Sequence, residues 1–276
     1  MTSSTVTLRD GVRLAYSEAG SGPVILLHPG FLLTRALWEP LVAELEGEFR
    51  CVSFDPRGHG ESDAPASGYT IERLAADIGE LTEALALEDV TLVGHSIGGA
   101  IASTAVLDHD AGDRIARLVL LGPAVPGFVQ RESQPYGVPR EVFEHLLAGI
   151  TADFLGTSRQ TEQIFFHQAD PEQAHRAMQA AEVMRPEVAA ELFAQLGEID
   201  LADRLPEIDV PVLALWGLHD TLSDPRWAGW FEERGLSGWQ LGTLEHSSHG
   251  SMLDEPAEVA RRIRDFVRTH PASRRP

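Results

Sequence analysis

Short, fully apolar runs alternate with helical patterns along most of this chain, and this alternation restricts the fold more than any other feature. Residues 24–27 form one such run, Val-Ile-Leu-Leu, with Gly-Pro before it and His-Pro-Gly after it. A continuous apolar run of this length between turn residues is typical of a strand that is buried on both faces. Similar runs lie at residues 51–54, 90–93, 118–121 and 212–216.

Helical patterns separate these runs, at residues 36–45, 71–87, 98–107 and 256–267. In the second of them, apolar residues recur at helical spacing with acidic residues between, which predicts an amphipathic helix. Buried strands that alternate with amphipathic helices favour a doubly wound, mostly parallel sheet of the α/β class. A hairpin at residues 6–8 and 14–18, with a turn at Asp10-Gly11, precedes this pattern.

The alternation stops between residues 122 and 205, where the chain is helix-like throughout and interrupted by prolines. Roughly 80 residues without a strand are too many for a crossover between parallel strands, so this stretch predicts an inserted helical lid. We therefore expect a core domain formed by residues 1–122 and 206–276, and a lid formed by residues 123–205.

A serine framed by two glycines lies between the run at 90–93 and the helix expected at 98–107. Residues 94–98 read Gly-His-Ser-Ile-Gly, which fits the G-x-S-x-G pattern of a nucleophile elbow. In an elbow the serine lies on a tight, strained turn, and the glycines lack the Cβ atoms that would collide across it. The N–H groups at the start of the following helix favour negative charge. Ser96 is therefore a candidate nucleophile.

With this elbow and several other segments, the chain resembles the α/β-hydrolase fold family over essentially its whole length. The matching segments are His28-Pro-Gly-Phe31, Trp38, Asp55-Pro-Arg-Gly-His-Gly-Glu-Ser62, Gly94-x-Ser96-x-Gly98, Asp220 and His249-Gly-Ser-Met-Leu-Asp-Glu-Pro256. Their order, spacing and strand context agree with the family pattern. A serine at the elbow implies the branch that holds esterases, lactonases, cofactor-free haloperoxidase-like enzymes and carbon–carbon bond hydrolases.

A serine hydroxyl needs a base that takes its proton and an acid that orients this base. We expect His249 to be the base, since it lies in a small, polar turn before a helix and fits the family signature H-x-x-x-x-[DE]-x-P; His246 is the alternative. We expect Asp220 to be the acid, because it follows the strand at 212–216 and site residues collect at that end of a parallel sheet. Asp224 is the alternative acid. Serine, aspartate and histidine then have the chain order expected for this fold.

Three other polar residues near the motifs have supporting roles in this interpretation. Asp55 precedes Pro-Arg-Gly, a tight-turn composition, and we interpret it as holding its loop. His28 and His95 flank the turn motifs, and we expect both to shape the site.

An attacked carbonyl develops an oxyanion, which needs two preorganised donors. One is the N–H of Ile97, the residue after the nucleophile. The other should come from the loop at residues 28–31, where the family has His-Gly and this chain reads His-Pro-Gly-Phe. Because proline has no N–H, Pro29 is excluded. Alignment from Trp38 makes the N–H of Phe31 the second donor.

The residue types exclude several activities of related enzymes. Haloalkane dehalogenases and epoxide hydrolases of this family have an aspartate at the elbow, so Ser96 argues against both. Hydroxynitrile lyases of this fold use a lysine, and all 22 basic residues here are arginine. Esters, lactones, thioesters and the carbon–carbon bonds of vinylogous diketones remain. In haloperoxidase-like enzymes and carbon–carbon hydrolases, methionine is common after the serine. This chain has Ile97 there, which argues slightly against both of these activities.

We expect a serine hydrolase that cleaves a small or medium-sized carboxylic ester or lactone through an acyl-enzyme. The alternatives are a carbon–carbon bond hydrolase and, in another class, a ligand receptor or a cyclase without net hydrolysis. The lid should enclose a mostly apolar pocket. Candidate substrate-binding residues are Trp38, Phe128, Tyr136, Phe165 and Met252; Arg140 or Arg159 could bind a substrate carboxylate, although both are more typical of a solvated surface.

With 42 acidic and 22 basic residues, the chain has a formal net charge of −20, which argues against nucleic acids and membrane surfaces as partners. We therefore expect a neutral, apolar small-molecule substrate. The absence of H-E-x-x-H, of a cysteine pair and of G-x-G-x-x-G predicts no metal and no cofactor. A single cysteine, Cys51, and the lack of a signal-peptide pattern or a long apolar stretch favour the cytoplasm. Residues 269–276 have the composition of a disordered tail, and the oligomeric state cannot be read.

Overall fold

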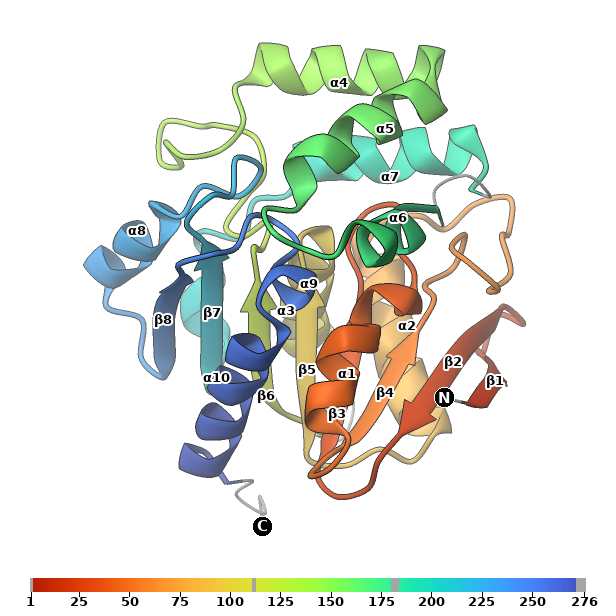
Figure 1. The fold of residues 1–276 in the computed structure, drawn as a ribbon, viewed down its shortest axis with the longest axis vertical. Coiled ribbons are helices and arrows are strands. Elements are labelled where there is room, and N and C mark those ends of the chain that lie inside the picture. The colour runs from red at the N-terminus through yellow and green to blue at the C-terminus, as the bar shows by residue number, and fades with distance from the viewer. Residues whose placement is uncertain (1, 111–112, 180–183, 272–276) are drawn as a thin grey trace.

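The structure, a computed structural model, describes residues 2–110, 113–179 and 184–271. Its centre is an eight-stranded sheet with the strand order β1-β2-β4-β3-β5-β6-β7-β8 (Figure 1). The strands are β1 (Thr2–Thr7), β2 (Arg13–Ala19), β3 (Val24–His28), β4 (Arg50–Phe54), β5 (Val90–His95), β6 (Ile115–Leu121), β7 (Val212–Gly217) and β8 (Trp239–Leu244). β2 pairs antiparallel with β1 and β4, and all other neighbours pair in parallel. The predicted α/β class is confirmed.

Alternate residues of the central strands supply two apolar cores, one on each face of the sheet. All residues of β3 are buried, with Ile25 and Leu27 in one core and Leu26 in the other. The neighbouring strand β5 divides in the same way, since Leu92 and Val93 belong to different cores. A strand covered on both faces has no side that favours polar residues, which explains the continuous apolar runs in the sequence.

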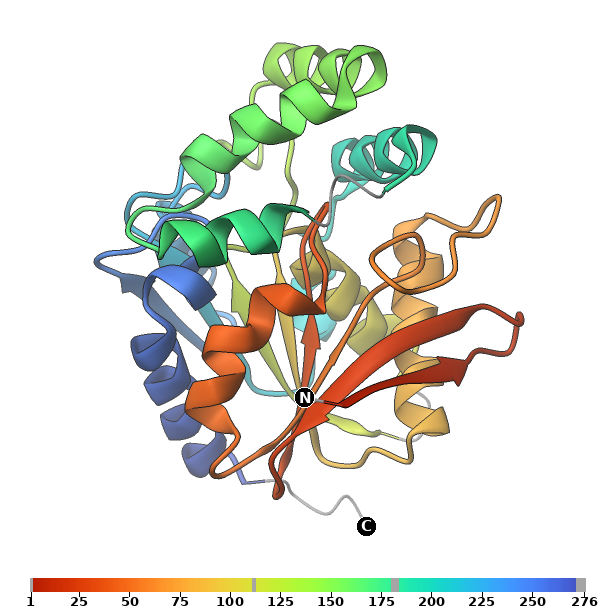
Figure 2. The ribbon, with the colours of Figure 1, turned by 45° about the vertical axis from the view of Figure 1, so that its right-hand side comes forward.

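Helices cover both faces of the sheet (Figures 1 and 2). On one face, α1 (Glu39–Leu45) packs against α10 (Pro256–Thr269), while α2 (Ile71–Ala84) and α3 (Ile97–Asp108) cover the other together with α8 (Trp227–Arg234). The predicted helix at residues 36–45 is a 3-10 turn, η1 (Arg35–Trp38), followed by α1, because Pro40 fits only the first turn of a helix.

Between β6 and β7 the chain forms α4 (Arg140–Ala152), α5 (Phe154–Phe165), α6 (Pro171–Gln179) and α7 (Pro186–Glu198). These helices lie beyond the carboxyl ends of the parallel strands, at the top of Figure 1. The expectation of helix throughout this stretch is wrong for residues 122–139, which form a loop with bridges from Val129 to Val138 and from Arg131 to Gln134. Prolines and glycines in that loop interrupt helical hydrogen bonding. The lid role and the domain boundaries stay predictions.

Near the carboxyl terminus the sequence interpretation missed two elements, β8 and α8. β8 is an edge strand whose residues are mostly half-exposed, so it lacks a continuous apolar run. The expected tail begins too early, because α10 extends to Thr269; residues 272–276 lie outside the described part.

The longest described helices, α2 and α10, have 14 residues each. A membrane-spanning helix needs about 20 mostly apolar residues. Within the described residues, no helix combines the length and the apolar character needed to cross a bilayer.

Candidate active site

Ser96 lies at the turn between β5 and α3, in a conformation that few residues other than glycine adopt. Its φ is 55° and its ψ is −124°. Such a conformation costs about 1–3 kcal/mol and persists only where the surroundings enforce it. A Cβ on Gly94 would lie 2.4 Å from the carbonyl oxygen of Gly98, so the turn closes only with glycine at this position. The predicted elbow geometry is present.

Gly98 has a different role from the one expected. A Cβ there would lie 2.5 Å from the carbonyl oxygen of Pro29, in the loop after β3. On the other side of this contact, a Cβ on Gly30 would lie 3.0 Å from Cβ of Ser96. These glycines therefore let the loop after β3 approach the serine, rather than relieve collisions within the elbow.

Asp220 and His249 form a buried pair beside the elbow. His249 Nδ1 lies 2.8 Å from Asp220 Oδ2, and the two side chains are 4% and 0% exposed. The other carboxylate oxygen, Oδ1, accepts the N–H groups of Leu222 (2.8 Å) and Ser223 (2.9 Å). An Nδ1–H donated to a fixed carboxylate leaves Nε2 of His249 as a proton acceptor.

The end of β6 connects this pair to Ser96. The N–H of Ser96 donates to the carbonyl of Leu121 at 3.1 Å. At the next residue, a Cβ on Gly122 would lie 3.1 Å from both Asp220 Oδ2 and His249 Nδ1. The structure therefore brings together the three predicted residues Ser96, Asp220 and His249, from segments far apart in the chain.

The two alternative residues lie in other surroundings. His246 is exposed, and its backbone N–H donates to Glu255 Oε2 at 2.9 Å. Asp224 forms an ion pair with Arg226, its neighbour in the same turn. The geometry therefore favours His249 and Asp220, which are buried and hydrogen bonded to each other beside the elbow.

The backbone N–H groups of Phe31 and Ile97 have no acceptor among the hydrogen bonds of the described residues, and the same holds for their neighbours Gly30, Leu32 and Gly98. Phe31 lies in a turn closed by the N–H of Leu33 and the carbonyl of Gly30, 3.2 Å apart. Leu32 has a φ of 65°, a value that a type II turn requires at its third residue. Phe31 and Ile97 also line one small cavity, together with the core residues Leu74, Ile101 and Leu192, but Ser96 and His249 are not among its lining residues, so this cavity does not mark the oxyanion position.

Three buried histidines around the site are neutral. Burial lowers the pKa of His28 and that of His59 to about 4. Burial and the neighbouring His249 lower the pKa of His95 well below its ordinary value. A neutral ring with Nε2–H can donate to the carbonyl oxygen of His249, 3.0 Å from His95 Nε2. His28 and His95 thus shape the site, as the sequence indicates.

These histidines predict a loss of stability in acid. Burial lowers the pKa of each one in the folded protein, so the unfolded chain binds more protons between about pH 6.5 and 4. The free energy of unfolding therefore falls as the pH is lowered through this window. We expect His59 to contribute about 2 kcal/mol of this loss by pH 5, measured by urea unfolding at pH 7.5 and pH 5.

Burial raises the pKa of Asp55 and Asp77, so these carboxyl groups increase the free energy of unfolding as the pH falls, in the opposite direction to the histidines. The contribution of His59 is therefore isolated by comparison of the native protein with a His59→Gln variant. Removal of His59 should make the pH dependence shallower, whereas His145→Gln, at an exposed position, should leave it unchanged. An equal pH dependence in the native protein and in His59→Gln would contradict the prediction.

Of the predicted substrate-binding residues, Phe165 lies nearest to the pair. Its ring centroid is 4.9 Å from that of His249, in an edge-to-face arrangement. Trp38 and Met252 are fully buried in the core beneath it. Phe165 therefore packs against His249, whereas Trp38 and Met252 lie within the core; a substrate contact of these three residues stays a prediction.

The other two predicted aromatics lie farther along the loop after β6. Phe128 packs in an aromatic cluster with Phe143 and Phe193, and Phe193 in turn contacts Phe31. Tyr136 packs edge-to-face on Trp227, with the Arg226 guanidinium 4.7 Å from its ring centroid. A substrate contact of these residues stays a prediction. Arg140 and Arg159 are exposed.

Asp55 holds its loop in the way that the sequence indicates. Its Oδ1 accepts the N–H of Arg35 at 2.8 Å, and its Oδ2 accepts the N–H of Glu61 at 3.0 Å. The carboxylate also pairs with the Arg35 side chain. These bonds engage both oxygens, so Asp55 fixes the path of the chain after β4.

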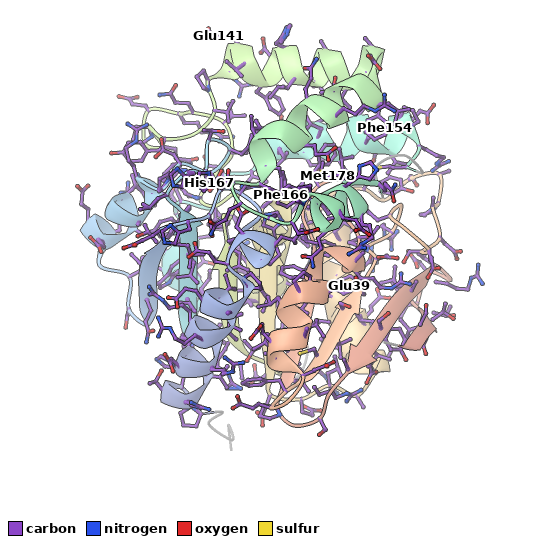
Figure 3. The ribbon with its side chains drawn as sticks, in the orientation of Figure 1. Glu39, Glu141, Phe154, Phe166, His167 and Met178 are labelled. Atoms are coloured by element: carbon purple, nitrogen blue, oxygen red, sulfur yellow. The ribbon has the colours of Figure 1, made fainter. Side chains whose placement is uncertain are left out.

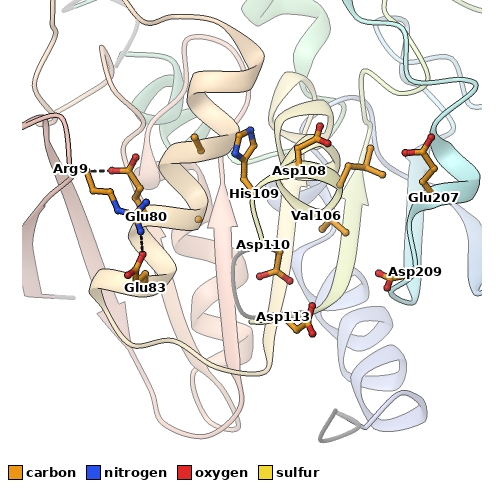
Figure 4. A pocket seen from close by; sticks show the side chains of 13 residues that line it. Arg9, Glu80, Glu83, Val106, Asp108, His109, Asp110, Asp113, Glu207 and Asp209 are labelled. Carbon is orange, nitrogen blue, oxygen red and sulfur yellow. Dashed lines mark hydrogen bonds and ion pairs between the residues drawn. The ribbon is translucent and has the colours of Figure 1, made fainter. Parts of the chain in front are cut away.

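An acidic cleft lies at the far end of α3 from Ser96 (Figure 4). Arg9 lies at one side of it and pairs with Glu83. α3 has 12 residues, so the cleft lies about 18 Å from the nucleophile along the helix axis. Part of the net negative charge is therefore gathered away from the site, on the carboxylates of Glu80, Glu83, Asp108, Asp110, Asp113, Glu207 and Asp209.

The sequence interpretation gave no role to Asp254 or Ser248. Both hydrogen bond to residues at the end of α5 and after it, and Ser248 precedes His249. The signal for Asp254 was present, because it occupies the acidic position of the H-x-x-x-x-[DE]-x-P signature. Its role depends on contacts with a segment more than 80 residues away, which a signature does not disclose.

Comparison with known proteins agrees with this arrangement. A family model described as alpha/beta hydrolase fold matches residues 23–256. The chain is 30% identical to a non-heme chloroperoxidase of Streptomyces lividans, over 96% of this chain and 99% of that protein. It is 31% identical to a non-heme chloroperoxidase of Kitasatospora aureofaciens, over 95% and 97%. Among solved structures, an esterase from Exiguobacterium antarcticum is similar, with a TM-score of 0.90, 29% identity and coverage of 97% and 100%.

Proposed function

Because the chain belongs to the α/β-hydrolase fold family, we propose that it is a serine hydrolase that cleaves a small or medium-sized carboxylic ester or lactone. The observation that carries this proposal is the buried hydrogen bond from His249 to Asp220 beside the strained elbow at Ser96. Nucleophilic catalysis by serine needs such a base, oriented by such an acid. The similar esterase structure supports the choice of an ester-type bond.

In the proposed reaction, Ser96 Oγ attacks the carbonyl carbon while His249 Nε2 takes its proton. Asp220 stabilises the imidazolium and keeps Nδ1 protonated, which leaves Nε2 free to act. The imidazolium then gives the proton to the leaving alkoxide, and an acyl-enzyme remains. A water molecule gives a proton to His249 and attacks the acyl carbon; the imidazolium then returns this proton to Ser96 Oγ as the bond to the acyl carbon breaks and the acid leaves.

The N–H groups of Phe31 and Ile97 are the proposed oxyanion donors. Both lie next to the nucleophile and neither has an acceptor among the hydrogen bonds of the described residues. Each such donor typically contributes about 10²–10³ in rate, because it is already oriented before charge develops. The aromatic side chains around the site favour a neutral, apolar substrate, as does the net charge of −20.

A fluorophosphonate probe and a panel of p-nitrophenyl esters and lactones test this proposal. We expect covalent labelling of the native protein and turnover of short-chain esters or lactones. Labelling without any turnover would instead indicate a receptor or cyclase. Bleaching of a vinylogous diketone, with no ester or lactone hydrolysis, would indicate a carbon–carbon bond hydrolase.

Asp220→Asn should lower kcat for p-nitrophenyl acetate by about 10³–10⁴-fold. An amide at this position donates to Nδ1 and so favours the tautomer with Nε2–H, which cannot accept the serine proton. Circular dichroism checks that the variant is folded, and steady-state kinetics give kcat.

Asp224→Asn is the matched control, since Asp224 lies four residues later and pairs only with Arg226 among the described ion pairs. We expect its kcat to stay within about twofold of native, because exposed pairs contribute little. A large loss in Asp224→Asn, with activity kept in Asp220→Asn, would assign the acid to Asp224.

A further inference from the structure

The Asp254 carboxylate binds four backbone N–H groups from two separate segments. Its Oδ1 lies 2.9 Å from each of the N–H nitrogens of His167, Gln168 and Ala169. Its Oδ2 lies 2.9 Å from the N–H nitrogen of Ser248. The residue is 8% exposed, and no cationic side chain pairs with it within the described residues. The negative charge is therefore balanced by peptide dipoles, which makes these hydrogen bonds strong.

The first of these segments is residues 164–169, the end of α5 and the residues after it, which we call the α5–α6 junction (Figure 3 labels Phe166 and His167 there). The second is residues 248–254, the chain around His249 with the short helix α9 (Ser251–Asp254), which we call the histidine loop. Two further hydrogen bonds join them, from Gly250 N–H to the Phe165 carbonyl (2.8 Å) and from the Ser248 hydroxyl to the Ile164 carbonyl (2.9 Å). The junction is thus attached to the loop on both sides of His249.

Contacts of the His249 ring depend on this attachment. Phe165, which belongs to the junction, places its ring edge-to-face with the His249 ring. Ser248 and Gly250, the chain neighbours of His249, are each held by a hydrogen bond to Asp254 or to the junction. Displacement of the junction would therefore change both the backbone and the packing of the histidine.

We propose that Asp254 is a positioning residue for His249, which it fixes by binding the α5–α6 junction to the histidine loop. The α5–α6 junction then forms a fixed wall of the site, because it stays bound to the histidine loop while substrate enters. The proposal rests on the proposed hydrolase function for its kinetic consequence, but the attachment itself can be measured without any substrate.

Asp254→Asn tests the proposal, because an amide presents N–H groups where the carboxylate accepts them. We expect kcat for p-nitrophenyl acetate to fall about 10- to 100-fold with KM nearly unchanged, since small misplacements of a catalytic group have effects of this size. The acid limb of the pH–rate profile should also move to lower pH, because a looser contact with Asp220 stabilises the imidazolium less. Asp170→Asn is the matched control: Asp170 directly follows the junction and accepts the N–H groups of Glu172 and Gln173, and among the described hydrogen bonds it makes none to the histidine loop.

Two readouts do not need activity. Hydrogen–deuterium exchange of the His167, Gln168 and Ala169 amides should accelerate in Asp254→Asn and stay at the native rate in Asp170→Asn. The downfield proton resonance of the Nδ1–H that His249 donates to Asp220 should be sharp in the native protein and broadened in Asp254→Asn. If the fluorophosphonate probe does not label the native protein and no ester is hydrolysed, the proposed function is wrong. The two readouts would still show whether Asp254 attaches the junction to the histidine loop.

Unchanged amide exchange in Asp254→Asn would overturn the proposal. So would faster exchange with native kcat, a native pH profile and a sharp resonance, because the attachment would then not position His249. Should Asp254→Asn fail to fold, Ser248→Ala replaces it, since this change removes the hydroxyl that bonds to the Ile164 carbonyl at 2.9 Å and, more weakly, to the His219 carbonyl at 3.2 Å. It should lower kcat in the same direction by a smaller factor, and a native kcat in that variant would contradict the proposal.

Discussion

Ser96→Ala is expected to lower kcat for p-nitrophenyl acetate by about 10⁵–10⁶-fold, the size of effect seen when a serine nucleophile is removed. The hydroxyl is the only group at the elbow that can form the acyl-enzyme, and no neighbouring side chain replaces it. Labelling by a fluorophosphonate probe should disappear with it. Steady-state kinetics and gel-based detection of the probe measure the two results.

The fold should survive this change, because alanine and serine face the same restriction at a φ of 55°. Ser103→Ala is the matched control: Ser103 is a buried serine on α3 whose hydroxyl, within the described residues, bonds only to the carbonyl of Gly99 at 2.8 Å. It should keep both activity and labelling. Labelling that persists in Ser96→Ala would place the nucleophile elsewhere and reject the serine-hydrolase proposal.

His249→Ala should reduce kcat by a similar factor, about 10⁵–10⁶-fold. Without the imidazole no group takes the proton of Ser96 Oγ, and the buried Asp220 carboxylate loses its partner. Kinetics with p-nitrophenyl acetate at a pH near 8 measure the effect, after thermal unfolding has shown that the variant is folded.

His246→Ala provides the comparison within the same loop. This histidine is exposed, and only its backbone N–H takes part in a described hydrogen bond, to Glu255. Alanine keeps that N–H, so most of the activity should remain. Loss of activity in His246→Ala together with native rates in His249→Ala would exchange the two assignments.

The central strands could be predicted from sequence because their environment is uniform. A residue in β3 or β5 is covered by helices whichever face it points to, so an apolar run is both necessary and recognisable. β8 lies at the sheet edge and is half-exposed, and its mixed sequence could not be distinguished from a loop. The prediction for residues 122–139 was wrong for a related reason, since Phe128 and Tyr136 pack on α4, α7 and α8 without repeating at a fixed period.

What the sequence determined by itself is the local chemistry: an elbow with the pattern Gly94-x-Ser96-x-Gly98 between a strand and a helix, and a chain order of serine, acid and base. What only the tertiary structure decided is which neighbouring side chains meet. Asp220 rather than Asp224 reaches His249, since its Oδ1 is fixed by the N–H groups of Leu222 and Ser223 while Oδ2 faces the imidazole. The attachment by Asp254 joins residues more than 80 positions apart. Such contacts depend on how separate segments pack, and a local pattern carries no record of that packing.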